Sequence, residues 1–224
     1  MQDPKFARDQ FDLIIAPDHD RLRGRNIIST IGALNSINAK TLKQAKKGFP
    51  DFKRLPSPRI AVLIGGNSKT HTMTTKDAER LANHLLTLQK EHKASLMMTC
   101  SRRTGKDNEA LLRKKLKGKD VHFWNGKGKN PLMSYLAWAD CVIVTSDSVS
   151  MISESISSGK PTYLYPLGGG SAKFNRFYES LIDKKYIRWI DGHLENWGSA
   201  PVNEAARLAD LFKERYLEHV TKSK

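Results

Sequence analysis

The densest group of hydroxyl and acidic side chains in the sequence follows an apolar run, Cys141–Thr145. Its members are Thr145, Ser146, Asp147, Ser148 and, where a helical pattern begins, Ser150. The amide groups and the dipole at a helix N-terminus favour an anion. The segment therefore predicts an anion-binding turn, although Ser148 or Asp147 would also serve as an ordinary helix cap.

One carboxylate, Glu154, lies about two turns into the same helical pattern, among small and apolar residues. A carboxylate in that position can accept hydrogen bonds from both hydroxyls of a ribose. The alternative is an ordinary surface residue, because Glu154 is turned by about 200° from both Ile152 and Ile156, which are expected on the buried side. Partial exposure is the compromise that the sequence predicts.

Two earlier strand ends carry groups that suit phosphates. After the run Ile60–Ile64 come Gly65, Gly66, Asn67 and Ser68, where two glycines let the backbone approach an anion. After the run Ala94–Thr99 come Ser101, Arg102 and Arg103, and paired arginines can hold a diphosphate bidentately. A tight structural turn and an exposed arginine loop are the respective alternatives.

A third candidate is the acidic and imidazole cluster Asp18-His19-Asp20, which follows an apolar run near the N-terminus. A histidine titrates near neutrality and can act as a general base when a carboxylate holds it. His19 and Asp18 are therefore the candidate catalytic residues. A turn whose polar side chains bond the local backbone is the alternative.

The elements that must position these groups alternate between short apolar runs and helical patterns from Arg59 onward. Such alternation is typical of βαβ units and a parallel sheet. The expected strands are Ile60–Ile64, Ala94–Thr99, Val121–Trp124, Cys141–Thr145, Thr162–Tyr165 and Ile187–Ile190. The expected helices are Thr74–Gln89, Asn108–Leu116, Leu132–Ala139, Val149–Ser157, Phe174–Lys184 and Val202–Tyr216. Ligands of such sheets bind outside the carboxyl ends of the strands, so Gly65, Ser101, Thr145 and Pro166 should converge.

The fold class is therefore α/β, with a doubly wound, parallel, Rossmann-like sheet in residues 59–200. Residues 1–58 hold two candidate strands, Phe11–Ala16 and Ile27–Ile31, followed by a basic stretch, Lys40–Pro58, which we interpret as a linker. So short a segment must pack on something else. Residues 201–224 form a final helix that should return to residues 1–58. That helix should bury a stripe of apolar side chains: Ala205, Leu208, Ala209 and Phe212.

Composition limits the class of protein. Hydrophobic residues make up 39% of the chain, no apolar run approaches the length of a membrane span, and the N-terminus lacks a signal-peptide core. The two cysteines, Cys100 and Cys141, lie in or beside apolar runs, which indicates reduced core residues and a cytoplasmic protein. The formal net charge is +15. Either this charge is a solvated surface or it meets a polyanion or the inner face of a membrane.

The motif Ser153-Glu154, followed after four residues by Gly159-Lys160-Pro161, resembles the donor-nucleotide motif of GT-B glycosyltransferases. The resemblance implies that Glu154 holds the ribose and that the preceding small residues face the diphosphate. It also matches the Gly65-Gly66 turn to the glycine-rich loop of the same half-molecule.

Four further segments extend along the N-terminal part of the chain: Gln2-Asp3-Pro4, Phe11-Asp12-Leu13, Pro17-Asp18-His19-Asp20 and Gly32-Ala33-Leu34-Asn35. They carry a wider resemblance, over nearly the whole chain, to the ELM-type mitochondrial-fission family of bacteria and plants. The turns at Gly65, Ser101 and Thr145 and the helix with Glu154 extend it. The resemblance implies a GT-B-like architecture, and plant members are linked to recruitment of a dynamin-related protein. Because the family carries an α/β region before the Gln-Asp-Pro element, we expect a truncated N-terminal domain here.

Two functions are consistent with these features. The first is a GT-B-type transferase that moves a sugar from a nucleoside diphosphate to an unknown acceptor. It needs no cofactor or metal, because arginine, backbone amides and a helix N-terminus can stabilise the leaving diphosphate. The second is a non-catalytic scaffold that acts through protein or membrane-surface contacts. Nucleic acid is not the expected partner, because the sequence has no RNA-recognition motif and its aromatic residues are not clustered.

Overall fold

A computed structural model describes residues 7–198 and 200–222 and contains one six-stranded sheet in which every pairing is parallel. The expected six parallel strands are confirmed. In sheet order they are β10 (Ile187–Trp189), β8 (Thr162–Tyr165), β7 (Cys141–Thr145), β3 (Arg59–Ile64), β5 (Ser95–Cys100) and β6 (Val121–Phe123).

The order of the strands decides where a ligand can enter. Counted along the chain, the six strands lie in the order 6-5-4-1-2-3, which is that of a Rossmann-type sheet. The chain winds outward in opposite directions from β3 and β7, and the ligands of such sheets bind beside the turns after these two neighbouring strands. This switch point is the expected ligand position.

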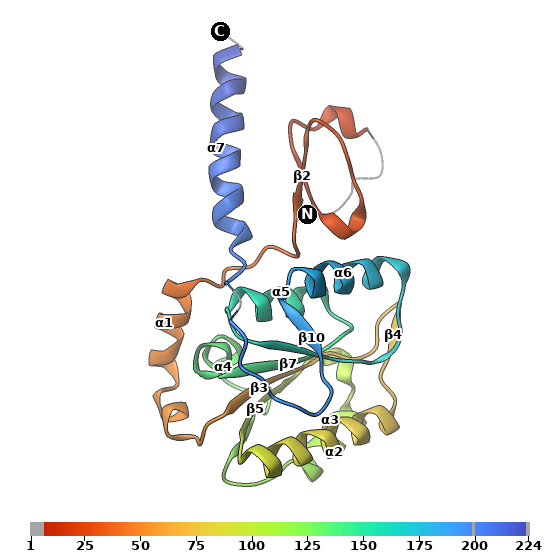
Figure 1. The fold of residues 1–224 in the computed structure, drawn as a ribbon, viewed down its shortest axis with the longest axis vertical. Helices are drawn as coiled ribbons and strands as arrows, with labels where there is room; N and C mark the ends of the chain where they lie inside the picture. Colours follow the sequence, from red (N-terminus) through yellow and green to blue (C-terminus); the bar gives the residue numbers. More distant parts are fainter. Residues whose placement is uncertain (1–6, 199, 223–224) are drawn as a thin grey trace.

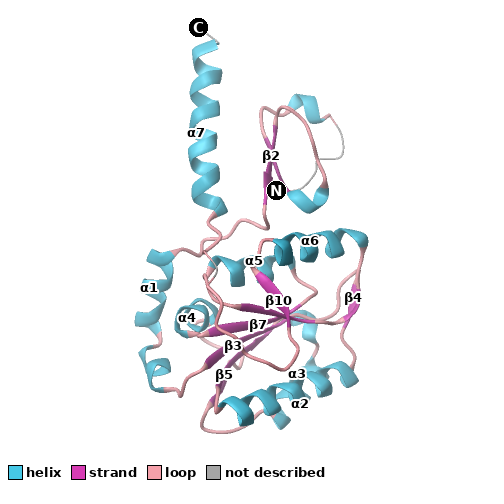
Figure 2. Ribbon diagram, viewed as in Figure 1, coloured by secondary structure: helices cyan, strands magenta, loops and turns pink. Residues whose placement is uncertain are grey.

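Helices cover both faces of the sheet (Figures 1 and 2). On one face lie α2 (Thr75–His92) and α3 (Lys106–Lys115), whose buried leucines pack on Ile60, Val62 and other residues of that face. On the other lie α4 (Leu132–Trp138), α5 (Val149–Ser157) and α6 (Ala172–Asp183). Two apolar layers therefore sandwich the sheet, as its short, wholly apolar strands require.

Capping side chains stand at the start of the helices α2, α5 and α6. Thr74 and Asp77 form a reciprocal capping box at the start of α2. Ser148 caps α5 by accepting a hydrogen bond from the Met151 amide, and Ser171 caps α6 in the same way. A short antiparallel pair, β4 (His71–Thr72) with β9 (Gly168–Gly169), ties the loop before α2 to the loop before α6.

The interpretation of residues 40–58 as a linker is wrong. Residues Ala39–Gly48 form α1, which begins at an Asn38–Thr41 capping box, and Pro50–Arg54 form a 3-10 turn. The Ser134 hydroxyl of α4 donates to the Ala45 carbonyl at 2.8 Å. Phe52 is buried in the core beneath α4. A few apolar side chains among many lysines are thus enough to attach this segment to the main body.

The N-terminal strands form a separate parallel pair, β1 (Ile14–Pro17) with β2 (Ile27–Thr30), so the expected strand near residue 11 begins three residues later. Short 3-10 turns stand before and after β1, at Arg8–Gln10 and Asp18–Asp20. Figure 1 shows this pair standing away from the large sheet, on the same side as the final helix. Residues Gln2-Asp3-Pro4 of the family motif lie outside the described residues.

The final helix, α7 (Glu204–Lys222), does contact residues 1–58, as expected. Glu204 accepts a hydrogen bond from the Ile31 amide at 3.1 Å, Arg207 donates to the Ser29 carbonyl, and Arg215 donates to the Arg25 carbonyl. The expected apolar stripe is wrong for three of its four members. Leu208 is buried, whereas Ala205, Ala209 and Phe212 are exposed. Polar contacts, rather than an apolar face, hold α7 against the N-terminal segment.

Across the described part of the chain, no helix combines the length and the hydropathy that a membrane span requires.

Candidate functional site

Four turns converge at the carboxyl edge of the sheet, as the sequence predicts. The Gly65 amide donates to the Thr145 hydroxyl at 2.7 Å, which joins the turns after β3 and β7. The Ser101 amide donates to the Ile64 carbonyl at 2.8 Å, and the Ser146 amide to the Tyr165 carbonyl at 3.0 Å. The predicted segments therefore meet at the switch point.

Asp147 occupies the centre of this junction. Its side chain is fully buried and accepts hydrogen bonds from the Thr145 hydroxyl at 2.6 Å and the Gly66 amide at 3.0 Å. Arg103 completes the set, with 2.6 Å between its Nη1 and the Asp147 Oδ2. The amide, hydroxyl and guanidinium groups that were predicted to hold a phosphate thus surround a carboxylate of the chain itself.

The two glycines are explained by this carboxylate. A Cβ atom on Gly65 would lie 2.2 Å from both carboxylate oxygens of Asp147. Gly66 has a φ of +153°, and a Cβ there would lie 2.1 Å from the Arg103 carbonyl oxygen. Only glycine lets the chain pass so close to its own anion. The glycine turn is consequently accounted for without a bound phosphate.

Most of the other predicted ligands shape their own loops. Asn67 accepts a hydrogen bond from the Met73 amide, and Ser68 accepts one from the His71 amide. Ser101 accepts one from the Arg103 amide, and Ser146 one from the Leu167 amide. These side chains fix the turns at the switch point, and their role as ligands stays a prediction.

Two aromatic residues that the sequence did not mark out also brace the edge. The Tyr178 hydroxyl of α6 donates to the Ser146 carbonyl at 2.6 Å and lies 3.2 Å from His71 Nε2. Burial lowers the pKa of His71, with Arg103 acting in the same direction and Asp147 opposing it. The neutral ring therefore serves as a hydrogen-bonding strut between β4 and α6.

Several groups at the carboxyl edge have hydrogen-bonding capacity that no other described residue uses. The amides of Val149 and Ser150 open α5 without a partner, as the first amides of a helix do. The exposed side chains of Ser150 and Arg102 also make no hydrogen bond or ion pair there. The amides and Ser150 can meet an anion that approaches α5 from solvent, and Arg102 lies in the turn after β5 at the same edge of the sheet.

Glu154 differs from the other carboxylates near the edge. It is half-buried on α5, and no hydrogen-bond or ion-pair partner of its carboxylate lies in the described residues. Burial raises the pKa of Glu154 above the ordinary value of a glutamate, with no nearby cation to offset it. An unpaired, partly desolvated carboxylate is typical of a group that awaits a ligand. Its half burial also agrees with the expected partial exposure.

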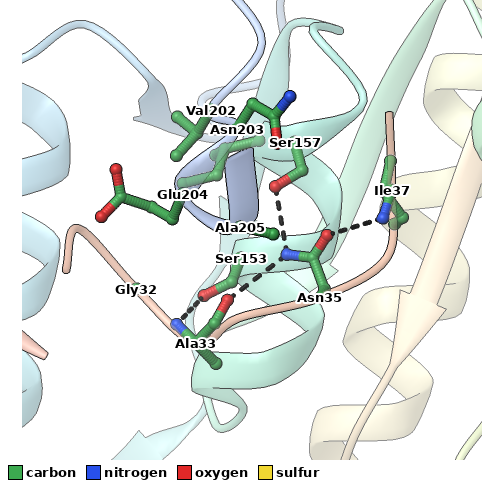
Figure 3. A pocket seen from close by; sticks show the side chains of 11 residues that line it. Gly32, Ala33, Asn35, Ile37, Ser153, Ser157, Val202, Asn203, Glu204 and Ala205 are labelled. Carbon is green, nitrogen blue, oxygen red and sulfur yellow. Dashed lines mark hydrogen bonds between the residues drawn. The ribbon is translucent and has the colours of Figure 1, made fainter. Parts of the chain in front are cut away.

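Figure 3 shows what lies against the neighbouring face of α5. The Ala33 amide donates to the Ser153 hydroxyl at 2.9 Å, and the Asn35 side chain donates to Ser157 at 3.1 Å. Gly32 passes so close that a Cβ atom would lie 2.3 Å from the Ser153 oxygen. The N-terminal segment is therefore fixed beside the helix that carries Glu154.

The proposed catalytic pair is not assembled as a base. His19 is 5% exposed, packs on Phe177 with 4.7 Å between ring centroids, and has an Nδ1 sealed from solvent without a partner in the described residues. Burial lowers the pKa of His19 to about 4. Asp18 turns to Arg23, and the carboxylate nearer to the imidazole is that of Asp20, at 3.9 Å. Catalysis by His19 and Asp18 stays a prediction that this geometry does not favour.

His19 has a structural contact instead. Its backbone carbonyl accepts two hydrogen bonds from Arg176 of α6, at 3.2 and 3.1 Å. Asp20 forms an ion pair with Lys173 of the same helix. The turn after β1 thereby docks the N-terminal strands on the main body.

Metal-ligating side chains do not gather at this edge. In residues 7–198 and 200–222, no three or more histidine, cysteine, aspartate or glutamate side chains converge as ligands of one ion. Both cysteines are free, and burial raises the pKa of each thiol to about 12.

The model of one protein family, described as mitochondrial fission ELM1, matches residues 1–216. The chain belongs to this family. The mitochondrial fission protein ELM1 of Arabidopsis thaliana is 30% identical over 237 aligned residues, which cover 93% of the chain and 55% of the plant protein. Protein RP120 of Rickettsia prowazekii is 31% identical, over 87% of the chain and 57% of its own length. The chain thus spans little more than half the length of these ELM1-family relatives.

Solved structures with a similar arrangement are more distant. WaaG, a glycosyltransferase of lipopolysaccharide biosynthesis, has a TM-score of 0.43 and 16% identity, over 84% of this chain and 48% of its own. MurG of Acinetobacter baumannii has a TM-score of 0.44 and 14% identity, over 88% and 49%. A UDP-GlcNAc 2-epimerase of Neisseria meningitidis, bound to UDP-GlcNAc, has a TM-score of 0.43 and 15% identity, over 87% and 57%.

Proposed function

We propose that this member of the ELM1 family binds a nucleoside-diphosphate sugar at the carboxyl edge of its sheet, with Glu154 holding the ribose. The observation that carries the proposal is the state of Glu154, a half-buried carboxylate without a partner in the described residues. The hydroxyls of a ribose would supply the two hydrogen bonds that this carboxylate lacks. The resemblance of the stretch from Ser153-Glu154 to Gly159-Lys160-Pro161 to the GT-B donor motif supports the same role for Glu154.

The position of the diphosphate follows from the groups that remain free. Asp147 fills the space between Gly65 and Arg103, and a second anion there would meet its negative charge. The opening amides of α5, the Ser150 hydroxyl and Arg102 stay available beside it. We therefore place the diphosphate at the N-terminus of α5, on the solvent side of the Asp147–Arg103 pair.

Sugar transfer is the reaction that this arrangement would serve. An acceptor hydroxyl attacks the sugar carbon, the bond from that carbon to the diphosphate oxygen breaks, and the nucleoside diphosphate leaves. The helix N-terminus and Arg102 would stabilise the charge on the leaving group. The acceptor proton would need a base other than the buried, neutral His19.

A non-catalytic scaffold is the second candidate, and one observation favours it. The predicted base, His19, is not accessible, because it is locked in a packing contact on α6. The name of the Arabidopsis relative, a mitochondrial fission protein, is also compatible with a role in assembly. In this case the protein would bind a nucleotide without catalysing sugar transfer, or would bind no nucleotide.

Titration calorimetry with UDP and the other nucleoside diphosphates tests the proposal. It is best done near 0.15 M salt, where non-specific attraction to a chain of net charge +15 is screened. The wild-type chain should bind one diphosphate. Glu154→Gln keeps the shape but removes the charge, so affinity should fall about tenfold or more, since hydrogen bonds to a charged acceptor contribute about 1.5–3 kcal/mol.

Glu179→Gln is the matched control, because Glu179 lies exposed on α6 and has no partner in the described residues. It removes the same charge and should bind like wild type. Equal binding by the Glu154 and Glu179 variants would remove Glu154 as the ribose anchor. If the wild-type chain binds no nucleoside diphosphate, the non-catalytic scaffold is the hypothesis that remains.

A further inference from the structure

A second cleft, of about 450 Å³, opens at the opposite, amino edge of the sheet. Its walls come from the residues that precede three strands: Pro58 before β3, Asp140 before β7 and Pro161 before β8. The five-residue strand β7 separates the two edges by roughly 16 Å. The cleft is therefore independent of the candidate nucleotide site.

Specific contacts hold the outer wall of the cleft in place. It consists of residues Leu194–Gly198, which return over the sheet edge after β10. Tyr163 of β8 anchors this segment, because its hydroxyl donates to the Glu195 carbonyl at 3.1 Å and accepts from the Glu195 amide at 2.5 Å. Trp197 packs edge-on against the Tyr163 ring, with centroids 4.8 Å apart. The cleft thus has a fixed aromatic wall.

The acidic groups of the cleft are each neutralised by an arginine. Asp140 accepts hydrogen bonds from the backbone amide of Arg59 at 2.7 Å and from its side chain at 3.2 Å. Glu195 forms an ion pair with Arg188, whose guanidinium also lies over the Trp197 ring. These pairs leave the negative charges of the cleft compensated.

Lys160, in contrast, is a charged residue of the cleft that has no partner of opposite charge in the described residues. It is half-buried in the wall, and its ammonium group has no hydrogen-bond or ion-pair partner in the described residues. Lys46 and Arg59 gather nearby over the Trp138 ring, at 4.7 and 5.8 Å. The pKa of Lys160 is lowered first by burial, then by the charges of Lys46 and Arg59, with Asp140 opposing. The cleft consequently holds an uncompensated positive charge in a partly desolvated place.

We propose that this cleft binds a small aromatic or otherwise planar organic anion, with its phosphate or carboxylate group on Lys160 and its apolar body against Trp197. The volume suits a small organic molecule rather than an inorganic ion alone. The Lys160 ammonium supplies the charge, and the Leu194–Gly198 segment supplies the shape. Phosphate and carboxylate share the chemistry that this lysine recognises.

Pyridoxal 5′-phosphate is the probe of the cleft, because it is a small aromatic molecule whose aldehyde reacts with the neutral form of a lysine amine, so its aldehyde would take the place of the anionic group at Lys160. The amine adds to the aldehyde with loss of water, and borohydride then delivers a hydride that makes the adduct permanent. The full chain is treated near pH 7.5, and the labelled lysines are located by peptide mass spectrometry. Lys160 should be labelled at least tenfold faster than exposed Lys114 of α3.

Competition identifies the anion. Phenyl phosphate, benzoate or both should slow the labelling of Lys160, and the stronger competitor shows which group the cleft prefers. UDP at the concentration that saturates the carboxyl edge should leave the labelling unchanged. Protection by neither small anion, or equal protection by UDP, would overturn the proposal.

Direct binding provides a second measurement. Calorimetric affinity for the better competitor should fall at least tenfold in Lys160→Gln and stay at the wild-type value in Lys114→Gln, which removes the same charge from an exposed helix position. Thermal unfolding checks that both variants are folded. An unchanged affinity in folded Lys160→Gln would show that the anion binds elsewhere.

Discussion

Asp147 and Glu154 lie seven residues apart on one strand–helix unit, and the structure treats them in opposite ways. Asp147 is fully buried and surrounded by the Thr145 hydroxyl, the Gly66 amide and the Arg103 guanidinium. Glu154 is half-buried with no partner in the described residues. Sequence alone marks both as ligand-binding carboxylates.

The contrast separates groups that build a site from groups that wait for a ligand. A buried carboxylate with complete hydrogen bonding stabilises the turns around it, and losing one partner leaves the rest uncompensated. A half-buried carboxylate without partners costs stability in the free protein and becomes useful only when a ligand supplies hydrogen bonds. Substitutions at the two positions should therefore have opposite consequences for stability.

The largest effect is expected at Asp147. Asp147→Asn keeps the shape but leaves Arg103 and the Gly66 amide without their anion. Breaking a buried pair costs about 3–5 kcal/mol, and the lower end applies because Arg103 is 37% exposed, so we expect about 3 kcal/mol. That corresponds to a melting temperature lower by roughly 6–12 °C, which differential scanning calorimetry measures.

A double-mutant cycle sharpens this test. Arg103→Gln removes the other partner, and the double variant should be less destabilised than the sum of the two single changes. Additive losses would mean that the two side chains do not interact, and Asp147 would then return to the list of free ligands.

An intermediate effect is expected at Glu204, a paired carboxylate outside the site. It accepts from the Ile31 amide and from Arg207, and it is 8% exposed. Glu204→Gln should weaken the attachment of α7 by about 1–2 kcal/mol. Hydrogen exchange should show the α7 amides opening more often, while the amides of the large sheet stay protected.

Glu214→Gln, on the exposed side of α7, is the control, since it removes the same charge without a contact in the described residues. Similar exchange in both variants would show that the Glu204 contacts do not hold the helix.

The fold of the large sheet could be predicted from the sequence because its strands are short and apolar on both faces, a pattern that little else produces. Residues 39–58 could not, because lysines outnumber the side chains that anchor the segment. Ala45 and Phe52 attach the segment only because α4 presents a matching surface to them, and the sequence does not show that surface. For α7, an apolar stripe suggested burial, but Glu204 and Arg207 make the contacts instead.

The location of the candidate site could also be predicted, because strand order brings Gly65, Ser101 and Thr145 to one edge. The role of each residue could not. Whether Arg103 meets a bound phosphate or Asp147 depends on the distance between two loops that are 44 residues apart (147 − 103). Composition gives no sign of that distance.

The smallest effect is expected at Glu154 in the absence of ligand, and its sign is the test of the comparison. Burial raises the pKa of Glu154 in the folded chain above its unfolded value, which is near 4.5. The folded state therefore binds the proton more tightly, and ionisation penalises folding at every pH above that range. Glu154→Gln has no charge to desolvate, so it should unfold at a slightly higher temperature than wild type at pH 7. Well below pH 4.5 both side chains are neutral in both states, so the difference should fade as the pH falls through that value. Melting temperatures of the two proteins between pH 4 and pH 8 measure this difference.

The opposite result would be a Glu154→Gln variant that is less stable than wild type at pH 7, with a deficit that shrinks in acid. It would mean that the ionised Glu154 has a stabilising partner in the free protein. Glu154 would then be a structural carboxylate like Asp147, and not an unpaired group that binds a ligand.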